Sequence, residues 1–129
     1  MPHFHLEYSA NLEEKVNVSA LCDSIRLAAI DIEIFPMPGI RVRATRVDHY
    51  SIADGNEKHG FIDLSIRLRE GRSEEAKRDA VEKIFETMCG FMEPVLGKAS
   101  VALSAEIRDI NTNLAPKSGN IRHNMLGNQ

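Results

Sequence analysis

The sequence predicts an α/β fold of the α+β kind, in which two fused β-α-β units form a four-stranded sheet with two helices on one face. Four segments alternate apolar with polar residues, which is typical of strands that bury one side. Two longer segments repeat apolar residues at helical spacing. The order strand, helix, strand occurs twice, and helices long enough to cross over imply parallel pairing of the strands within each unit.

The first unit covers residues 2–50. Apolar and polar residues alternate over 4–8, which predicts an opening strand that begins at Pro2. An apolar stripe at helical spacing over 18–32 predicts the first helix. A turn rich in proline follows, and then a second strand is predicted over 40–50, with arginines on one of its faces.

The second unit covers residues 58–110. The cleanest alternation of the sequence, over 62–68, predicts its first strand. A long helix follows, and we expect Ser73 to cap its N-terminus and Gly97 to end it as a left-handed residue. Alternation over 101–107 predicts the last strand, which completes the sheet.

The C-terminal tail, residues 111–129, is rich in Asn, Pro and Gly and shows no periodicity. It is therefore predicted as turns and loop, with a short hairpin or a helical turn as further options. Hydrophobic residues make up 43% of the chain and charged residues 27%, so we expect a globular protein rather than a disordered one. Residues 1–129 are predicted to form a single domain with a core that needs neither disulfide nor metal.

Charge and cysteine content narrow the class of protein further. A net charge of −3 lacks the basic surplus of most nucleic-acid-binding proteins, so no nucleic-acid partner is expected. The N-terminus does not resemble a signal peptide, and no apolar run is long enough for a membrane span. The two cysteines, Cys22 and Cys89, lie in helical patterns and are expected to be free, buried thiols of a cytoplasmic protein.

Pro2 has two interpretations. Proline commonly begins a strand because its missing N–H does no harm there. If Met1 is removed, however, Pro2 also leaves a free secondary amine at the start of the chain. A free α-amine has a pKa near ~8 in water, and burial or neighbouring cations lower that pKa. Because a neutral amine near cellular pH is a good general base, Pro2 is the candidate catalytic residue.

Two arginines stand at the ends of predicted elements, where side chains can converge at a sheet edge. Arg41 follows the proline-glycine turn, and Arg72 lies in the turn that enters the second helix. A guanidinium binds a carboxylate through two parallel hydrogen bonds, although any single arginine is more often a solvated surface charge. Arg41 and Arg72 are candidate catalytic and substrate-binding residues, and Arg43 and Arg46 are weaker candidates by position.

His3 and His5 lie two residues apart on the first strand and so share one face of the sheet. A His-x-His pair can ligate a metal, but no further cluster of His or Cys supports such a site. We therefore expect packing or surface roles for both histidines, and neither a metal nor a cofactor.

Five short motifs occur in order along the chain: Met1-Pro2-His3-Phe4, Ile34-Phe35-Pro36 leading to Gly39-Ile40-Arg41, Ala53-Asp54-Gly55, Gly71-Arg72-Ser73 and Leu103-Ser104-Ala105-Glu106-Ile107. Each motif alone is weak, but the ordered set resembles the 5-carboxymethyl-2-hydroxymuconate isomerase family of the tautomerase superfamily. The resemblance extends from Pro2 to about Leu114.

This resemblance implies a homotrimer of fused β-α-β units, with active sites near the subunit interfaces. It implies a cofactor-free isomerisation of a small tricarboxylate, the dienol 5-carboxymethyl-2-hydroxymuconate, in the degradation of homoprotocatechuate and 4-hydroxyphenylacetate. The amine of Pro2 would move a proton from the 2-hydroxyl side of the conjugated system to a distal carbon. Arg41 and Arg72 would hold carboxylates and stabilise the developing charge.

Two alternatives stay open at this point. One is a tautomerase of the same superfamily that acts on another 2-hydroxydienoate or on a phenylpyruvate-like enol. The other is a catalytically silent trimeric binding module that keeps only the fold. The presence or absence of Met1 distinguishes the two enzyme hypotheses from the silent module, because Pro2 can act as a base only when Met1 has been removed.

Overall fold

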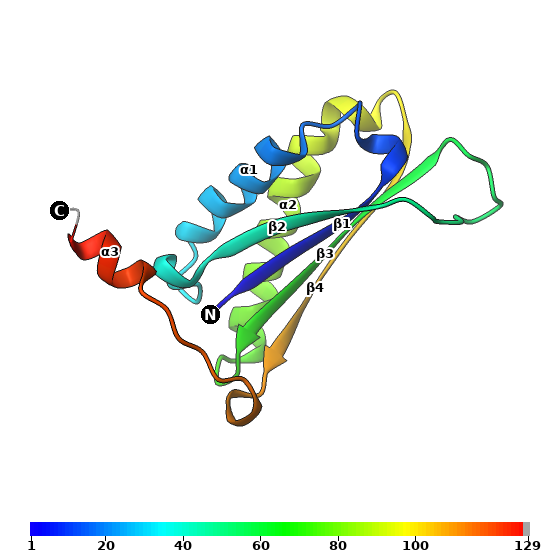
Figure 1. Ribbon diagram of the computed structural model, residues 1–129. Helices are drawn as coiled ribbons and strands as arrows, with labels where there is room; N and C mark the ends of the chain where they lie inside the picture. Colours follow the sequence, from blue (N-terminus) through cyan, green and yellow to red (C-terminus); the bar gives the residue numbers. More distant parts are fainter. Residues whose placement is uncertain (128–129) are drawn as a thin grey trace.

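A computed structural model describes residues 1–127 of the chain, and the last two positions of the predicted tail, 128 and 129, lie outside the described residues (Figure 1). Four strands form one sheet in the order β2-β1-β3-β4. Both long helices cover the same face of this sheet (Figure 1). The bounds of these elements are β1 His3–Ser9, α1 Val18–Ile30, β2 Arg41–Val47, β3 His59–Arg69, α2 Glu74–Leu96 and β4 Ser100–Ile110.

The strand pairing follows the two-unit prediction. β1 pairs with β2 in parallel, and β3 pairs with β4 in parallel. The two units meet where β1 and β3 pair antiparallel at the centre of the sheet. The predicted four-stranded sheet with two helices on one face is therefore confirmed. β2 ends at Val47 rather than near Tyr50, because its last partner on β1 is Ser9, where β1 itself ends.

The core lies between the sheet and the two helices. Alternate residues of the central strands are buried, as the period-two pattern predicts. Phe4 at the start of β1 packs edge-to-face against Phe35, with ring centroids 4.9 Å apart. This contact anchors the turn before β2 beside the N-terminus. The sheet contributes Phe4, Leu6, Tyr8, Ile62, Leu64, Ile66 and Leu68, and the long helices contribute Leu21, Ile25, Ala29, Ala80, Ile84, Met88 and Met92.

Side chains cap the two long helices at their N-termini. The carboxamide oxygen of Asn17 accepts a hydrogen bond from the backbone N–H of Ala20 at 3.0 Å. The Ser73 hydroxyl accepts one from Ala76 at 3.1 Å, which confirms that predicted cap. The prediction for Gly97 is wrong, because its φ of −71° is right-handed. The chain continues into a further right-handed turn there, so a left-handed residue is not required.

The tail contains more structure than turns and loop. A short 3-10 turn, Thr112–Leu114, follows β4, and a helix, α3 Ile121–Gly127, lies near the described end of the chain. Of the predicted options, the helical one forms. The tail passes from the end of β4 across the end of the sheet to α3, which contacts the 3-10 turn Met37–Gly39 before β2 (Figure 1). The N-terminus therefore lies between the first strands and the tail.

Further predictions concern the cysteines and membrane spans. Cys22 and Cys89 are free, as predicted, but each is half-buried rather than buried. Cys22 packs against the edge of the core, where its side chain is only partly covered. Across residues 1–127, none of the helices is both long and apolar enough to cross a membrane.

Candidate active site

The N-terminus packs tightly against the turn that precedes β2. Pro2 is buried, and its carbonyl oxygen accepts a hydrogen bond from the backbone N–H of Arg41 at 3.3 Å. A Cβ on Gly39 would lie 3.1 Å from Cδ of Pro2, so the glycine permits this close approach. The first two residues are thus held beside the first residue of β2.

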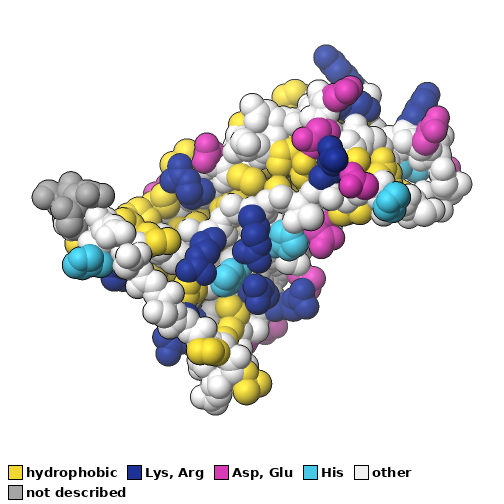
Figure 2. All heavy atoms as spheres, viewed as in Figure 1, with side chains coloured by type: hydrophobic (Ala, Val, Ile, Leu, Met, Phe, Trp, Pro, Cys, Tyr) yellow, Lys and Arg dark blue, Asp and Glu magenta, His cyan; other side chains and the backbone are white. Residues whose placement is uncertain are grey.

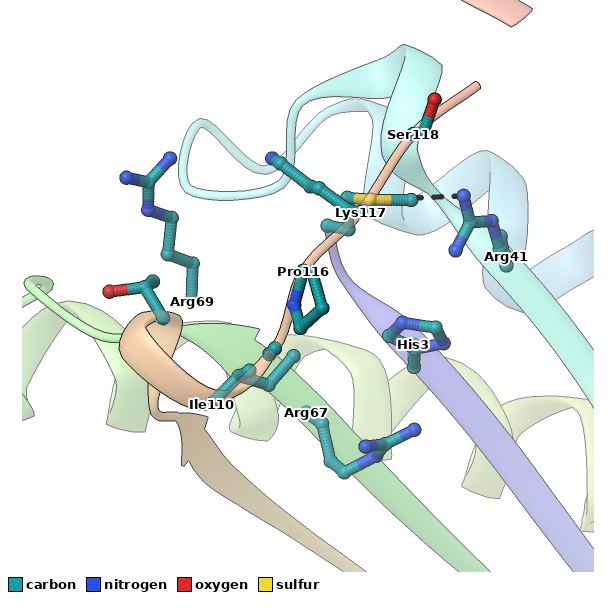
Figure 3. A pocket seen from close by; sticks show the side chains of 11 residues that line it. His3, Arg41, Arg67, Arg69, Ile110, Pro116, Lys117 and Ser118 are labelled. Carbon is teal, nitrogen blue, oxygen red and sulfur yellow. Dashed lines mark hydrogen bonds between the residues drawn. The ribbon is translucent and has the colours of Figure 1, made fainter. Parts of the chain in front are cut away.

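A cavity of about 560 Å³ opens beside the N-terminus (Figure 3). The cavity is lined by His3 of β1, Arg41 of β2, Arg67 and Arg69 of β3, and Lys117 of the tail. The remaining lining residues are Met1, Ile110, Thr112, Ala115, Pro116 and Ser118. No carboxylate occurs among these lining residues, although the chain as a whole carries a net negative charge.

The strand register explains why basic residues converge here. His3 pairs with Arg41 on one side and with Arg67 on the other, so the three lie in one row across the sheet. Arg67 in turn pairs with Arg108 on β4. All four side chains belong to the face that the helices leave open, because residues on the opposite face form the core.

The surroundings of this cavity lower the pKa of two basic groups, the α-amine of Met1 and the imidazole of His3. Burial lowers the pKa of the α-amine at Met1, and the charges of Lys117, Arg72, Arg69 and Arg41 lower it further, in that order. Burial also lowers the pKa of His3, with Arg67, Arg43 and Arg41 adding to the effect. Both groups are thereby biased toward the forms that can accept a proton.

The residues predicted as the site are brought together only in part. Pro2 and Arg41 are adjacent, but only Arg41 lines the cavity; Pro2 is buried, and Met1 before it lines the cavity instead. Arg72 does not line the cavity, and its guanidinium donates a hydrogen bond to the carbonyl of Arg69 at 3.1 Å. Its charge nevertheless lowers the pKa of the N-terminal amine. Arg46 lies elsewhere, in an ion pair with Asp48 at 2.9 Å.

The two histidines of the first strand have separate partners. Nδ1 of His3 lies 3.3 Å from a guanidinium nitrogen of Arg43, and Nε2 of His5 lies 2.9 Å from the hydroxyl of Thr45. His3 reaches the cavity, whereas His5 does not. In the part of the chain that the structure describes, no group of three or more His, Cys, Asp or Glu residues is placed to hold a metal ion.

Sequence reasoning missed three basic residues of the cavity: Arg67, Arg69 and Lys117. A signal for the first two was present, because both lie on the polar face of the strand with the cleanest alternation. Lys117 lies in a segment without periodicity, so no local pattern distinguishes it from an ordinary surface lysine. Only the path of the tail across the sheet end places it at the site.

Comparisons with known proteins support a specific family. Residues 2–125 match the family model described as 5-carboxymethyl-2-hydroxymuconate isomerase. The chain is 31% identical over 121 residues to 5-carboxymethyl-2-hydroxymuconate Delta-isomerase of Escherichia coli, with 94% of this chain and 96% of that protein covered.

Solved structures give the same result. A crystal structure of a 5-carboxymethyl-2-hydroxymuconate delta-isomerase superposes with a TM-score of 0.90 at 30% identity, covering 97% of this chain and 93% of that one. A 5-carboxymethyl-2-hydroxymuconate isomerase from Deinococcus radiodurans R1 gives a TM-score of 0.87 at 31% identity, covering 96% and 93%.

The fold and these relatives define the protein as an isomerase, and the predicted resemblance is confirmed. More narrowly, the chain belongs to the 5-carboxymethyl-2-hydroxymuconate isomerase family.

Proposed function

We propose that this protein isomerises 5-carboxymethyl-2-hydroxymuconate, with the amine of Pro2 as the general base once Met1 has been removed. One observation carries the proposal: the N-terminus adjoins a cavity with four basic side chains and no lining carboxylate. Such a cavity favours a substrate with several negative charges. The relatives are named for activity on 5-carboxymethyl-2-hydroxymuconate, a dienol tricarboxylate, which is a substrate of this kind.

The amine of Pro2 accepts the proton from the 2-hydroxyl side of the dienol, and the electron pair moves along the conjugated carbons. The resulting ammonium then returns a proton to a distal carbon, so that no atom and no electron is gained or lost overall. The first transfer requires a neutral amine. Burial and basic neighbours lower the pKa of the α-amine at Met1, and we expect the same influences on Pro2 when it begins the chain.

The basic side chains bind and polarise the substrate. Arg41 lies beside Pro2 at the cavity and is suited to bidentate binding of a carboxylate. Arg72 binds a second carboxylate, which requires its side chain to leave the carbonyl of Arg69. Their charges also stabilise the enolate that forms when the hydroxyl loses its proton. No cofactor is needed for this proton transfer.

The proposal includes a homotrimer that acts in the cytoplasm, in homoprotocatechuate degradation. The sheet face opposite the helices carries His3, His5 and Arg43, and a second copy of the chain would cover it. The half-buried free thiols of Cys22 and Cys89 agree with a reducing compartment. Light scattering on the purified protein measures the number of subunits directly.

An ultraviolet assay tests the activity. The mature protein is supplied with the dienol tricarboxylate and, separately, with phenylenolpyruvate, which has one carboxylate. The proposal expects faster turnover of the tricarboxylate. Turnover of phenylenolpyruvate alone would instead favour another tautomerase activity, and turnover of neither would favour a silent binding module.

A further inference from the structure

A second cavity adjoins the first near the N-terminus. It measures about 320 Å³ and shares Met1, Arg41, Lys117 and Ser118 with the first cavity. Its other walls are Pro38 and Gly39 before β2, and Gly119, Ile121 and Arg122 where the tail enters α3. The proton-transfer mechanism proposed above assigns no role to this second cavity or to Arg122.

Met1 lines both cavities and contacts two other residues that border them. A Cβ on Gly39 would lie 3.4 Å from Cα of Met1, and Nη2 of Arg41 donates to Sδ of Met1 at 3.8 Å (Figure 3). Loss of Met1 removes both contacts, takes away a residue that lines both cavities, and leaves Pro2 as the first residue of the chain. It also frees the Arg41 guanidinium, which faces both spaces.

The second cavity has the same charge character as the first. Arg41, Lys117 and Arg122 line it, and no Asp or Glu is among its lining residues. Basic side chains gather beside the tail on the open side of the molecule, whereas acidic ones lie mainly elsewhere on that face (Figure 2). Since the whole chain carries a net charge of −3, this is a local concentration of positive charge.

We propose that the second cavity is a subsite for a carboxylate at the end of the substrate opposite the first cavity, held by Lys117 and Arg122. This inference rests on the proposed function and names where a third carboxylate goes. The substrate lies across the former position of Met1, with its reacting centre at Pro2 and carboxylates on both sides. The second cavity alone is at the lower end of the range for small-molecule sites, about 300–1,000 Å³, which suits one end of a ligand rather than a whole one.

Each cavity has at least one arginine that the other lacks, which provides a matched pair of variants. Arg122 lines only the second cavity and Arg67 only the first. Arg78 on α2, which lies 3.9 Å from Glu74 on the helical side of the sheet, serves as the control. The variants are Arg122→Gln, Arg67→Gln and Arg78→Gln, and Arg122→Lys tests whether positive charge restores binding.

The first measurement is calorimetric and needs no turnover. Propane-1,2,3-tricarboxylate and phenylpyruvate are titrated into protein that lacks Met1. We expect Arg122→Gln to raise the Kd of the tricarboxylate about tenfold, which corresponds to about 1.4 kcal/mol of binding free energy. The Kd of phenylpyruvate should stay within about twofold of the value for the parent protein. Arg122→Lys should recover most of the loss, and Arg78→Gln should match the parent protein for both ligands.

The second measurement compares substrates. Arg122→Gln should lower the ratio of kcat/KM for the dienol tricarboxylate to that for phenylenolpyruvate about tenfold. The subsite would be refuted if Arg122→Gln left the affinity for the tricarboxylate unchanged, or if it lowered the affinity for both ligands equally in calorimetry. A parent protein that binds the tricarboxylate through Arg122 but does not isomerise the dienol would instead refute the proposed function alone.

Discussion

Replacement of Arg41 by glutamine removes the one guanidinium that borders both cavities. The side chain is half-buried at the start of β2, and its only hydrogen bond within residues 1–127 is the weak one to the sulfur of Met1. It belongs to none of the ion pairs of the described chain. We therefore expect Arg41→Gln to change the free energy of unfolding by no more than about 0.5 kcal/mol.

The effect on the reaction should be far larger than the effect on stability. Loss of one oriented charge partner at a developing oxyanion typically lowers kcat about 100-fold or more. That factor corresponds to about 2.7 kcal/mol of transition-state stabilisation. Because Arg41 lies beside Pro2 and its charge helps to lower the pKa of the N-terminal amine, we expect Arg41→Gln to lose at least about 100-fold in kcat/KM.

The assay is the ultraviolet measurement of dienol isomerisation at a fixed pH, with thermal unfolding recorded on the same samples. Arg43→Gln is the matched control, because Arg43 is two residues further along β2 on the same face but lines neither cavity. It should keep kcat/KM within about fivefold of the parent protein. A loss below fivefold in Arg41→Gln, or equal losses in the two variants, would refute the assignment of the pocket.

Three other predictions concern pH dependence, packing and helix capping. In the proposed mechanism the neutral amine of Pro2 is the active form, and we expect its pKa to be lowered by the same surroundings that lower the pKa of the Met1 α-amine. The value of kcat/KM should therefore fall as pH drops through that pKa, and Lys117→Gln, which removes the largest charge contribution at Met1, should move the acid limb of the pH profile to higher pH. An acid limb that stays in place would contradict this role. Ile84→Ala leaves a cavity at a fully buried position of α2 and should lower the free energy of unfolding, measured in urea, by about 2–5 kcal/mol. A decrease below about 1 kcal/mol would contradict this prediction. Ser73→Ala removes the N-terminal cap of α2 and should lower the free energy of unfolding by about 1 kcal/mol in the same assay. Ser73→Asn should retain most of the stabilisation, because asparagine also caps helices.

Local patterns were enough to predict most of the fold. The alternation over 62–68 corresponds to β3, because each apolar residue in it is buried beneath the helices. Ser73 caps α2 because a hydroxyl at that position meets an unpaired backbone N–H, whatever the rest of the chain does. The end of β2 depends instead on where β1 ends, and no pattern within 40–50 contains that information.

The candidate site was less predictable than the fold for a related reason. Pro2 and Arg41 are brought together by parallel pairing of β1 and β2, which the two-unit order implied. Arg67 joins them through the antiparallel register of β1 and β3, which periodicity does not determine. Lys117 and Arg122 depend on the path of the tail, whose residues carry no periodic signal. The contacts most distant in sequence were the ones that sequence patterns could not supply.

The central claim is that the free amine of Pro2 performs the proton transfer. The most direct test is the isomerisation rate of two samples of the same chain, one with Met1 retained and one from which an aminopeptidase has removed it, with intact mass recorded for each. We predict turnover of the dienol tricarboxylate by the sample that begins at Pro2 and less than about 1% of that rate, a 100-fold loss, when Met1 blocks the amine. Equal rates in the two samples would contradict the account, because the nitrogen of Pro2 is an amide while Met1 is present.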